Sequence, residues 1–530
     1  MWTLSLKPAD VPGSAVPAIL VGLFVSSGGV LFGYDTGIIG GILAMKKWRE
    51  LFSTGYINPV DHLPDVNTAQ QSEIVSILSA GTFFGAIFSA PAADYLGRRW
   101  AMILNSCVFA FGVILQVAAT SIPLFSAGRF FAGGGVGLLS ATIPLYQSET
   151  APKWIRGTLV GCYQLSITVG LFLAAIVNNA TKDRHDTGCY RIPVAVQFLF
   201  AIILVVGMLL LPETPRYLIK VAKPKEAAKA LARLRRLPED HPSIQEEVAE
   251  IQANHEFELA LGQASYLSCI KKPIRKRLLT GIFLQALQQL TGVNFIFYYG
   301  TSYFSNSGLE NPFTVSVITS VVNICSTLPG LWLVEKWGRR RLLMFGALGM
   351  ATSQMIVASV GTALPDNVAA NKALIAFVCI YIFFFACSWG PAAWVITGEI
   401  FPLKARAKGL SMTTASNWLL NWAIAYSTPF LVSSGPGNAD LGSKVFFIWG
   451  GFCCLCWVYV FFTVYETKGL SLEEVDELYN DIKYAWRSQH YQPSSTFVQM
   501  QEDVQRKASV RAAGGETKTI VNSSVHIESQ

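Results

Sequence analysis

The sequence predicts an all-α membrane protein with twelve transmembrane helices, arranged as two pseudo-symmetric bundles of six. Of its 530 residues, 52% are hydrophobic and 14% are charged, which is too apolar for a soluble chain of this length. The apolar residues form long runs, and about 20 such residues span a hydrocarbon core as a helix. Short charged motifs recur in the second half in the same order, about 250 residues later, as expected of two repeated bundles.

Hydropathy places six spans in each half. In the first half they lie near residues 17–40, 73–92, 100–120, 122–144, 158–180 and 192–211. In the second half they lie near residues 278–300, 312–334, 342–363, 371–396, 409–431 and 444–465. The spans themselves carry most of the ten cysteines, which we interpret as small packing residues.

The spans divide the chain into five parts. These are an N-terminal segment (1–16), a first bundle (17–211), a linker with amphipathic helices (212–277), a second bundle (278–466) and a tail (467–530). The tail ends in a polar, Ser/Gln-rich stretch, so we expect most of it to be disordered.

Basic residues cluster in the loops that follow the even-numbered spans. The positive-inside rule therefore puts these loops, the linker and both termini in the cytoplasm of a multi-pass protein. The net charge of +7 belongs to these loops, so we expect a lipid bilayer as surroundings and no nucleic-acid partner. No nucleophile–base set or metal-ligand cluster is evident, which argues against an enzyme, a metal site or a cofactor. Asn179 lies in a sequon on the outer side, and its close approach to the membrane leaves its glycosylation open.

The repeated motifs place acidic and basic residues at the cytoplasmic ends of helices. In the first half they are Asp94, Arg98, Arg99, Glu149 and Arg156; in the second they are Glu335, Arg339, Arg340, Glu399 and Arg406. Each set can form a salt-bridge network that closes the inner face and breaks when that face opens. Topology alone needs basic residues but no fixed acid spacing, so we expect a gating role.

Two charged residues lie well inside the spans, away from their ends, where charge is costly. Asp35 lies in the first span and Arg129 in the fourth, at similar depth, so an ion pair between them is expected. A step that changes their separation would load or release a proton, because the guanidinium stabilises the carboxylate. The alternative is a static pair that only fixes two helices.

Neutral amides and tryptophans are spread over several spans. They include Gln164, Gln285, Gln288, Gln289, Asn294, Asn323, Trp394, Asn417 and Trp418. Amides offer a donor and an acceptor to adjacent hydroxyl groups, and an indole face suits a sugar ring. The set therefore predicts a site for a neutral polyhydroxyl ligand, although single amides often serve only as interhelical contacts.

Several spans contain residues that interrupt helices. Thr291-Gly292, Gly390-Pro391 and the run Gly133-Gly-Gly with Pro144 lie in spans seven, ten and four. Broken helices near the middle of a membrane are typical of moving parts.

Over about residues 20–475 the chain resembles the sugar porter family of the major facilitator superfamily. The resemblance rests on Phe32-Gly-Tyr-Asp35, Asp94-x-x-Gly-Arg-Arg, Gly128-Arg129, Glu149-x6-Arg156-Gly157, Pro212-Glu-Thr-Pro-Arg216, Gln288-Gln289-x4-Asn294, Gly390-Pro-x-x-Trp394 and Glu466-Thr-Lys-Gly. Stretches such as Tyr146-Gln-Ser-Glu-Thr-Ala-Pro-Lys-Trp-Ile-Arg-Gly are similar to fungal hexose transporters in particular.

The resemblance implies a rocker-switch bundle with a central sugar site. It implies sugar contacts at Gln164, Gln288, Gln289, Asn294, Asn323, Gly390, Trp394 and Asn417. It also implies that Asp35 accepts a proton with Arg129 as its partner. The chain departs from the family pattern at Ala90, Tyr465 and Asn417, where glycine, proline and, in some bacterial members, glutamine stand.

The expected function is therefore a plasma-membrane transporter of glucose and related monosaccharides, working by alternating access with sugar:proton symport. Its partners would be a monosaccharide, a proton and the bilayer. Two alternatives remain: a uniport facilitator in which Asp35 is structural, and a glucose receptor that signals without much transport. Pentose or hexose preference depends on the placement of single amides.

Overall fold

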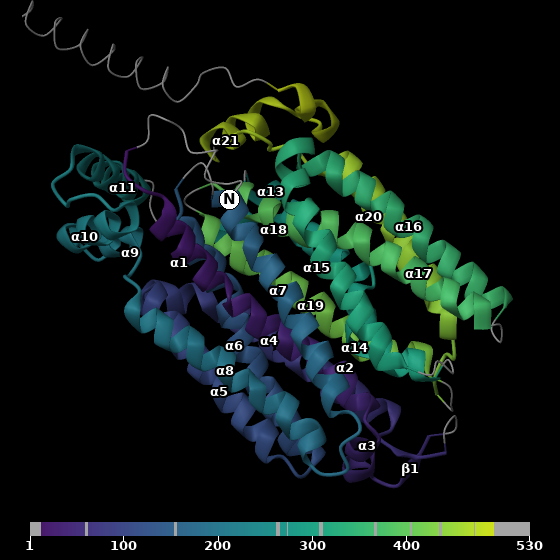
Figure 1. Cartoon of the computed structure of the whole chain (residues 1–530). Helices are drawn as coiled ribbons and strands as arrows, with labels where there is room; N and C mark the ends of the chain where they lie inside the picture. Colours follow the sequence, from purple (N-terminus) through teal and green to yellow (C-terminus); the bar gives the residue numbers. More distant parts are fainter. Residues whose placement is uncertain are drawn as a thin grey trace, which may run out of the picture.

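The computed structural model describes residues 12–491, except 59–61, 153–155, 261–264, 273, 307–310, 365–367, 403–404, 434–436 and 471. Figure 1 shows two helical bundles side by side, one from each half of the chain. The predicted disorder of the tail falls largely on residues 492–530, which lie outside the described residues.

Seven helices build the N-terminal half. They are α1 (Val16–Ser26), α2 (Gly28–Ala44), α4 (Thr68–Leu96), α5 (Arg98–Ala118), α6 (Ile122–Thr150), α7 (Arg156–Thr181) and α8 (Gly188–Leu210). Between α2 and α4 lie the short helix α3 (Lys46–Phe52) and an antiparallel pair of strands, β1 (Tyr56–Ile57) and β2 (Pro64–Asp65). We call the end of the molecule that carries these short elements the hairpin end.

The C-terminal half contains α13 (Ile274–Leu290), α14 (Val293–Asn306), α15 (Pro312–Trp337), α16 (Arg339–Ala363), α17 (Val368–Phe384), η3 (Phe385–Trp389), α18 (Gly390–Glu399), α19 (Arg406–Val432), η5 (Gly442–Lys444) and α20 (Val445–Thr463). The linker forms α9 (Pro215–Lys220), α10 (Pro224–Arg235), α11 (Pro242–Ala260) and α12 (Tyr266–Ile270), and the tail forms α21 (Leu472–Asp481) and η6 (Ala485–His490). These linker and tail elements lie opposite α3 and β1 (Figure 1), at what we call the linker end.

Ten helical stretches of the described chain are long and apolar enough to cross a membrane. Two further passes are made by α13 with α14 and by α19, so the predicted twelve-span fold is confirmed. α13 and α14 are separated by Gly292, whose φ of +84° suits glycine. α19 carries Asn417 and Asn421, so its low hydropathy reflects polar groups placed inside the bundle.

Of the three predicted helix interruptions, the one in span ten takes a different form and the one in span four is absent. Span ten passes through the π-helical turn η3 before Pro391, a distortion that is common at functional sites. Span four is the continuous helix α6, with Pro144 inside it. Its glycines allow close packing instead: a Cβ at Gly133 would lie 2.1 Å from the carbonyl oxygen of Leu78 in α4. The prediction of a break in span four was therefore wrong, because small residues bring α4 and α6 together.

The two halves meet mainly along three helix pairs, α4 with α19, α7 with α15, and α2 with α14. α14 is the part of span seven that follows the break at Gly292. The first half therefore contacts a helix segment that is separated from the rest of its span.

Candidate functional site

A cluster of buried amides lies where α13 packs against α19. Asn417 is at its centre: its Nδ2 donates to Oε1 of Gln285 at 2.7 Å and to Oε1 of Gln288 at 2.9 Å. Its Oδ1 accepts a 2.9 Å bond from Nε2 of Gln289. The three glutamines share one face of α13 because they are spaced by three and four residues. We call these residues, with Asn294 and Asn421, the amide cluster.

On the side of span ten, the amide cluster contacts the distorted backbone. Nε2 of Gln288 donates to the carbonyl oxygens of Trp389, at 2.8 Å, and of Gly390, at 3.2 Å. Nε2 of Gln285 donates to the hydroxyl of Thr397 at 3.3 Å. The carbonyl groups where the π-helical turn meets α18 thus orient the amide of Gln288.

On its other side the cluster reaches α14 and the N-terminal half. The side chains of Asn294 and Asn421 both donate to Oε1 of Gln289. Oδ1 of Asn421 accepts from the hydroxyls of Tyr298, at 3.1 Å, and Ser79, at 2.7 Å. Because Ser79 belongs to α4, this bond joins the two halves at the edge of the cluster.

The remaining predicted contacts lie around this cluster. A Cβ built on Gly390 would lie 3.6 Å from Nε2 of Gln164, so the α7 amide faces span ten across the interface. Asn323 is buried in α15 and Trp394 is partly buried in α18, and neither side chain has a hydrogen bond to the cluster among the described residues. The indole of Trp418 is buried and packs edge-on against Phe32 of α2, with ring centroids 5.0 Å apart.

This arrangement can bind a neutral ligand with many hydroxyl groups. Each amide has a donor and an acceptor, and at present these groups bond mainly to one another. A ligand hydroxyl can replace such a bond without leaving a buried charge behind, which a charged site would not allow. Buried, mutually bonded amides are therefore suited to exchange partners with a sugar.

Asp35 and Arg129 are both fully buried inside the N-terminal half. Their charges interact, but neither side chain makes a hydrogen bond or ion pair with any other described residue. The expected ion pair is thus a pair of neighbouring charges that do not touch. Tyr298 and Tyr299 of α14 also interact electrostatically with Arg129. Because Tyr298 bonds to Asn421, the Asp35–Arg129 pair lies near the edge of the amide cluster.

At the linker end, the first-half motif forms one connected network. The Arg98 guanidinium lies 2.9 Å from Oε1 of Glu149 and 3.6 Å from Oδ1 of Asp94. The hydroxyl of Thr214 donates to the other oxygen of Glu149 at 2.5 Å. Glu213 accepts from the backbone N–H groups of Arg98 and Arg99, so it caps α5 with a negative charge. Burial raises the pKa of the Glu213 carboxyl, and the backbone N–H groups oppose that shift.

The second half repeats this network. Arg339 lies 2.9 Å from Glu399 and 3.1 Å from Glu335. Thr467 donates to Glu399 at 2.6 Å, and Glu466 caps α16 by accepting from the N–H groups of Arg339 and Arg340. The glycine before each arginine pair has φ near +88°, +87° at Gly97 and +89° at Gly338, and a Cβ at either position would lie 2.5 Å from the capping carboxylate.

Other predicted gate residues have different partners. Arg99 donates to the carbonyl oxygens of Met208 and Leu209, and Arg340 donates to that of Phe461. They tie α5 to α8 and α16 to α20 rather than pairing with the predicted acids. Arg406 begins α19 and Arg156 begins α7; the side chain of Arg156 lies outside the described part of the chain.

Several important residues were missed from the sequence. Glu213 and Glu466 stand in the motifs that carry the family resemblance, but their capping role depends on contacts more than 110 residues away. Asn421 could have been found, because it follows Asn417 by one helical turn. Ser79 could not, since a single serine in an apolar span carries no signal.

Contacts close the interface between the halves near both ends. At the hairpin end, a Cβ on Gly40 of α2 would lie 2.8 Å from the carbonyl oxygens of Phe297 and Tyr298 in α14. At the linker end, the hydroxyl of Ser411 donates to the carbonyl of Ala86 at 2.9 Å, and that of Tyr266 to Ile87 at 3.3 Å. The amide cluster lies between these two closures.

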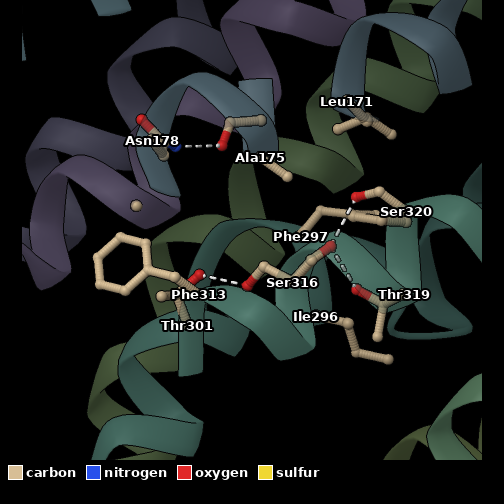
Figure 2. Close-up of a pocket in the computed structure, with 12 residues that line it drawn as sticks. Leu171, Ala175, Asn178, Ile296, Phe297, Thr301, Phe313, Ser316, Thr319 and Ser320 are labelled. Carbon is tan, nitrogen blue, oxygen red and sulfur yellow. Dashed lines mark hydrogen bonds between the residues drawn. The ribbon is translucent and has the colours of Figure 1, made fainter. Parts of the chain in front are cut away.

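A hollow remains between the halves toward the hairpin end. Figure 2 shows hydroxyl groups of α14 and α15 around it, including Thr301, Ser316 and Thr319, with Asn178 from α7. The space is partly open to solvent. It lies on the approach to the amide cluster from that end.

The chain matches the family model for "Sugar (and other) transporter" over residues 21–479. It is 60% identical over 503 residues to the major facilitator-type transporter ecdD of Aspergillus rugulosus, covering 93% of each chain. It is 53% identical to a probable glucose transporter, rco-3, of Neurospora crassa, covering 94% of this chain and 85% of that one. It is 39% identical to the high glucose sensor RGT2 of Saccharomyces cerevisiae, covering 94% of this chain and 66% of the sensor.

Among solved structures, the proton:xylose symporter XylE bound to 6-bromo-6-deoxy-D-glucose superposes with a TM-score of 0.75. The match covers 88% of this chain and all of XylE at 24% identity, and it shows the shared fold. The matched family model spans both helical bundles and the linker between them. This chain belongs to the sugar transporter family of the major facilitator superfamily.

Proposed function

We propose that this chain is a plasma-membrane transporter that takes up glucose and related hexoses by alternating access, coupled to the entry of a proton. The observation that carries the proposal is the buried amide cluster around Asn417, formed by a broken helix and lying between two closures of the interface. Its uncharged donors and acceptors favour a neutral polyhydroxyl substrate over an ion or an organic anion.

The linker end is assigned to the cytoplasm, because the basic loops lie there. The two Arg–Glu networks then hold the inner face together within each half. The interhalf contacts of Ser411 and Tyr266 would separate when that face opens, and those of Gly40 and Ser79 when the outer face opens.

In this scheme substrate binding drives closure at α14. Sugar hydroxyls that bond to Gln289 on α13 and to Asn294 on α14 engage both sides of the break at Gly292. This favours the position of α14 in which it packs on α2, because a ligand shifts an equilibrium by its differential affinity for the two states. Trp418, whose indole nitrogen is buried without a described partner, is one further group available to the substrate.

Proton coupling is assigned to Asp35. Its carboxylate and Arg129 are buried as neighbouring charges without contact. A protonated Asp35 frees Arg129 from that interaction, and movement of α2 against α6 changes the stability of the charged form. Tyr298, on α14, lies near both this pair and the amide cluster, which supports a link between the two.

The proposal is tested by uptake of labelled glucose in yeast that lacks its own hexose carriers. We expect saturable uptake, competition by unlabelled hexoses, and accumulation above the external concentration. Asp35→Asn should abolish accumulation while exchange of labelled for unlabelled sugar continues. Accumulation that survives in Asp35→Asn would contradict the coupling role.

A second candidate is a glucose receptor, favoured by the 39% identity to a glucose sensor. Such a protein would bind the sugar through the same amides without moving it. Surface expression with sugar-dependent protection from unfolding, but no uptake, would support this candidate over the transporter.

A further inference from the structure

Buried polar side chains surround the Asp35–Arg129 pair inside the N-terminal half. Gln116 of α5 and Gln197 of α8 are both 0% exposed. Neither amide has a hydrogen-bond partner at 3.5 Å or less among the described residues, and the same holds for the Ser126 hydroxyl, the Asp35 carboxylate and the Arg129 guanidinium. Such a concentration of unpaired buried groups is unusual, because each one carries a desolvation cost.

These groups are arranged as a column along their helices. From the hairpin end, Gln116 is the third residue from the end of α5 and Ser126 the fifth residue of α6. Arg129 is the eighth residue of α6 and Gln197 the tenth of α8. At 1.5 Å per residue, Gln116 and Ser126 lie about 3 to 6 Å from the hairpin-end termini of their helices. Arg129 and Gln197 lie about 10 to 14 Å from those termini.

Helix faces show that the column lies on the side of α2 opposite the hollow, whose lining includes Gly37 and Gly41. On α2, Gly33, Gly37 and Gly41 face α7, where added Cβ atoms would meet Ile167, Ala174 and Asn178. Asp35 lies on the opposite face at about 100° per residue. It therefore points away from α7.

Several contacts hold the column together. The Tyr34 hydroxyl donates to the carbonyl of Pro193 at 3.1 Å, which fixes α2 against α8 one turn from Gln197. The Gln197 amide lies near enough to stabilise the Asp35 carboxylate, although no bond of 3.5 Å or less joins them. A Cβ at Gly128 would lie 2.7 Å from Cγ of Gln116, so this amide packs on α6 beside Arg129.

Aromatic rings cover the column at the hairpin end. Trp48 stacks on Phe52 at 5.0 Å, and Phe52 contacts Phe125 at 6.0 Å and Tyr190 at 5.5 Å. The Tyr190 hydroxyl donates to the carbonyl of Ala119, at the end of α5, at 2.9 Å. We call these four rings the aromatic plug; Phe125 lies one helical turn above Arg129.

We propose that this column is a water-binding chamber, lined by Gln116, Ser126 and Gln197, closed by the aromatic plug and separate from the sugar path. In this chamber Gln197 is a positioning residue for Asp35. Bound water would satisfy the unpaired amides, as buried water does in other proteins. The part of the inference that concerns Gln197 rests on the proposed proton coupling, whereas the chamber itself does not.

Within the described residues, few charged and titratable groups act on Asp35. Arg129 contributes from α6, and the phenol of Tyr298 contributes from α14, with Tyr299 acting on Arg129. α8 contributes the neutral amide of Gln197. Because an amide does not titrate in this range, its role is to orient and stabilise the carboxylate through hydrogen bonding.

The first experiment measures uptake against pH in proteoliposomes that contain the full chain. Gln197→Leu removes the neighbouring amide that stabilises the carboxylate and should move the midpoint of the pH profile upward by about one unit, with the sugar KM at saturating proton unchanged within about twofold. Asn105→Leu removes another buried amide, about 16 Å away from Gln116 along α5, and should leave the midpoint in place. Equal profiles for Gln197→Leu and Asn105→Leu would overturn the positioning role.

The second experiment tests the chamber without relying on coupling. Ser126→Cys is exposed to a small water-soluble thiol reagent, and the labelled peptide is identified by mass spectrometry. Opening the plug with Trp48→Ala should speed labelling at least tenfold, while Asn105→Cys stays unlabelled in either background. Labelling of Ser126→Cys that is as slow as that of Asn105→Cys after the plug is opened would overturn the chamber. Uptake that is independent of pH in the unmodified protein would refute the proposed coupling and with it the role of Gln197. The labelling experiment would still decide whether the chamber exists.

Discussion

The Ser79 hydroxyl donates a 2.7 Å hydrogen bond to Oδ1 of Asn421, and this bond joins the two halves beside the amide cluster. Asn421 also bonds to Tyr298 and Gln289. A single side chain therefore contacts the first half, the helix α14 and the candidate sugar site.

Ser79→Ala should loosen this junction. A neutral hydrogen bond contributes about 0.5–1.5 kcal/mol, so the population open at the hairpin end should rise about two- to tenfold. The alkylation rate of a cysteine placed at Thr301, in the hollow, measures that population. Ser89→Ala is the matched control, since Ser89 lies on the same helix and its side-chain bond within the described part of the chain is to Ala86 of that helix; equal rates in both variants would contradict the junction.

Asn417→Ala should impair sugar binding most strongly. It removes hydrogen bonds to three glutamines at once, and buried amides left unpaired cost about 1–3 kcal/mol each. We expect the glucose KM to rise more than tenfold, or uptake to be lost, with surface expression retained. Asn105→Ala, also a buried amide, should leave the KM unchanged. A normal KM in Asn417→Ala would show that the sugar binds elsewhere.

Gly40→Val should block closure at the hairpin end. Its side chain would collide with the carbonyl oxygens of Phe297 and Tyr298, which a Cβ alone approaches to 2.8 Å. Because closure is needed for turnover and not for initial binding, the maximal uptake rate should fall at least tenfold while sugar still protects the protein from thermal unfolding. Gly134→Val is the control, as no atom lies within 4 Å of a Cβ there; a similar loss of uptake in that variant would show that the effect is not specific to closure.

Arg98→Ala and Arg339→Ala should both destabilise the protein. Each arginine side chain is at most 8% exposed and is paired with a glutamate, and removing one partner of a buried pair costs about 3–5 kcal/mol. Thermal unfolding in detergent should therefore occur at clearly lower temperature. Arg184→Ala removes an exposed pair with Asp186 and should change stability by less than about 1 kcal/mol. If all three variants unfold at the same temperature, the networks are not structural.

The sequence was sufficient to predict the twelve spans, because lipid forces apolar runs into helices. It also located Gln288, Gln289 and Asn417, since buried amides are conspicuous in apolar spans. It misjudged Gly133 and its neighbours, because a glycine that permits close packing looks the same as one that breaks a helix. The capping of α5 by Glu213 and the bond between Ser79 and Asn421 depend on contacts far apart in the chain, which a single sequence does not encode locally.

The most direct test of the account is the initial rate of labelled glucose uptake in yeast without other hexose carriers, measured with and without a protonophore. The account predicts saturable uptake that needs Asn417 and that collapses when the proton gradient is removed. Uptake at the same rate in both conditions would contradict the coupling role of Asp35, and a lack of uptake despite surface expression would contradict the transporter itself.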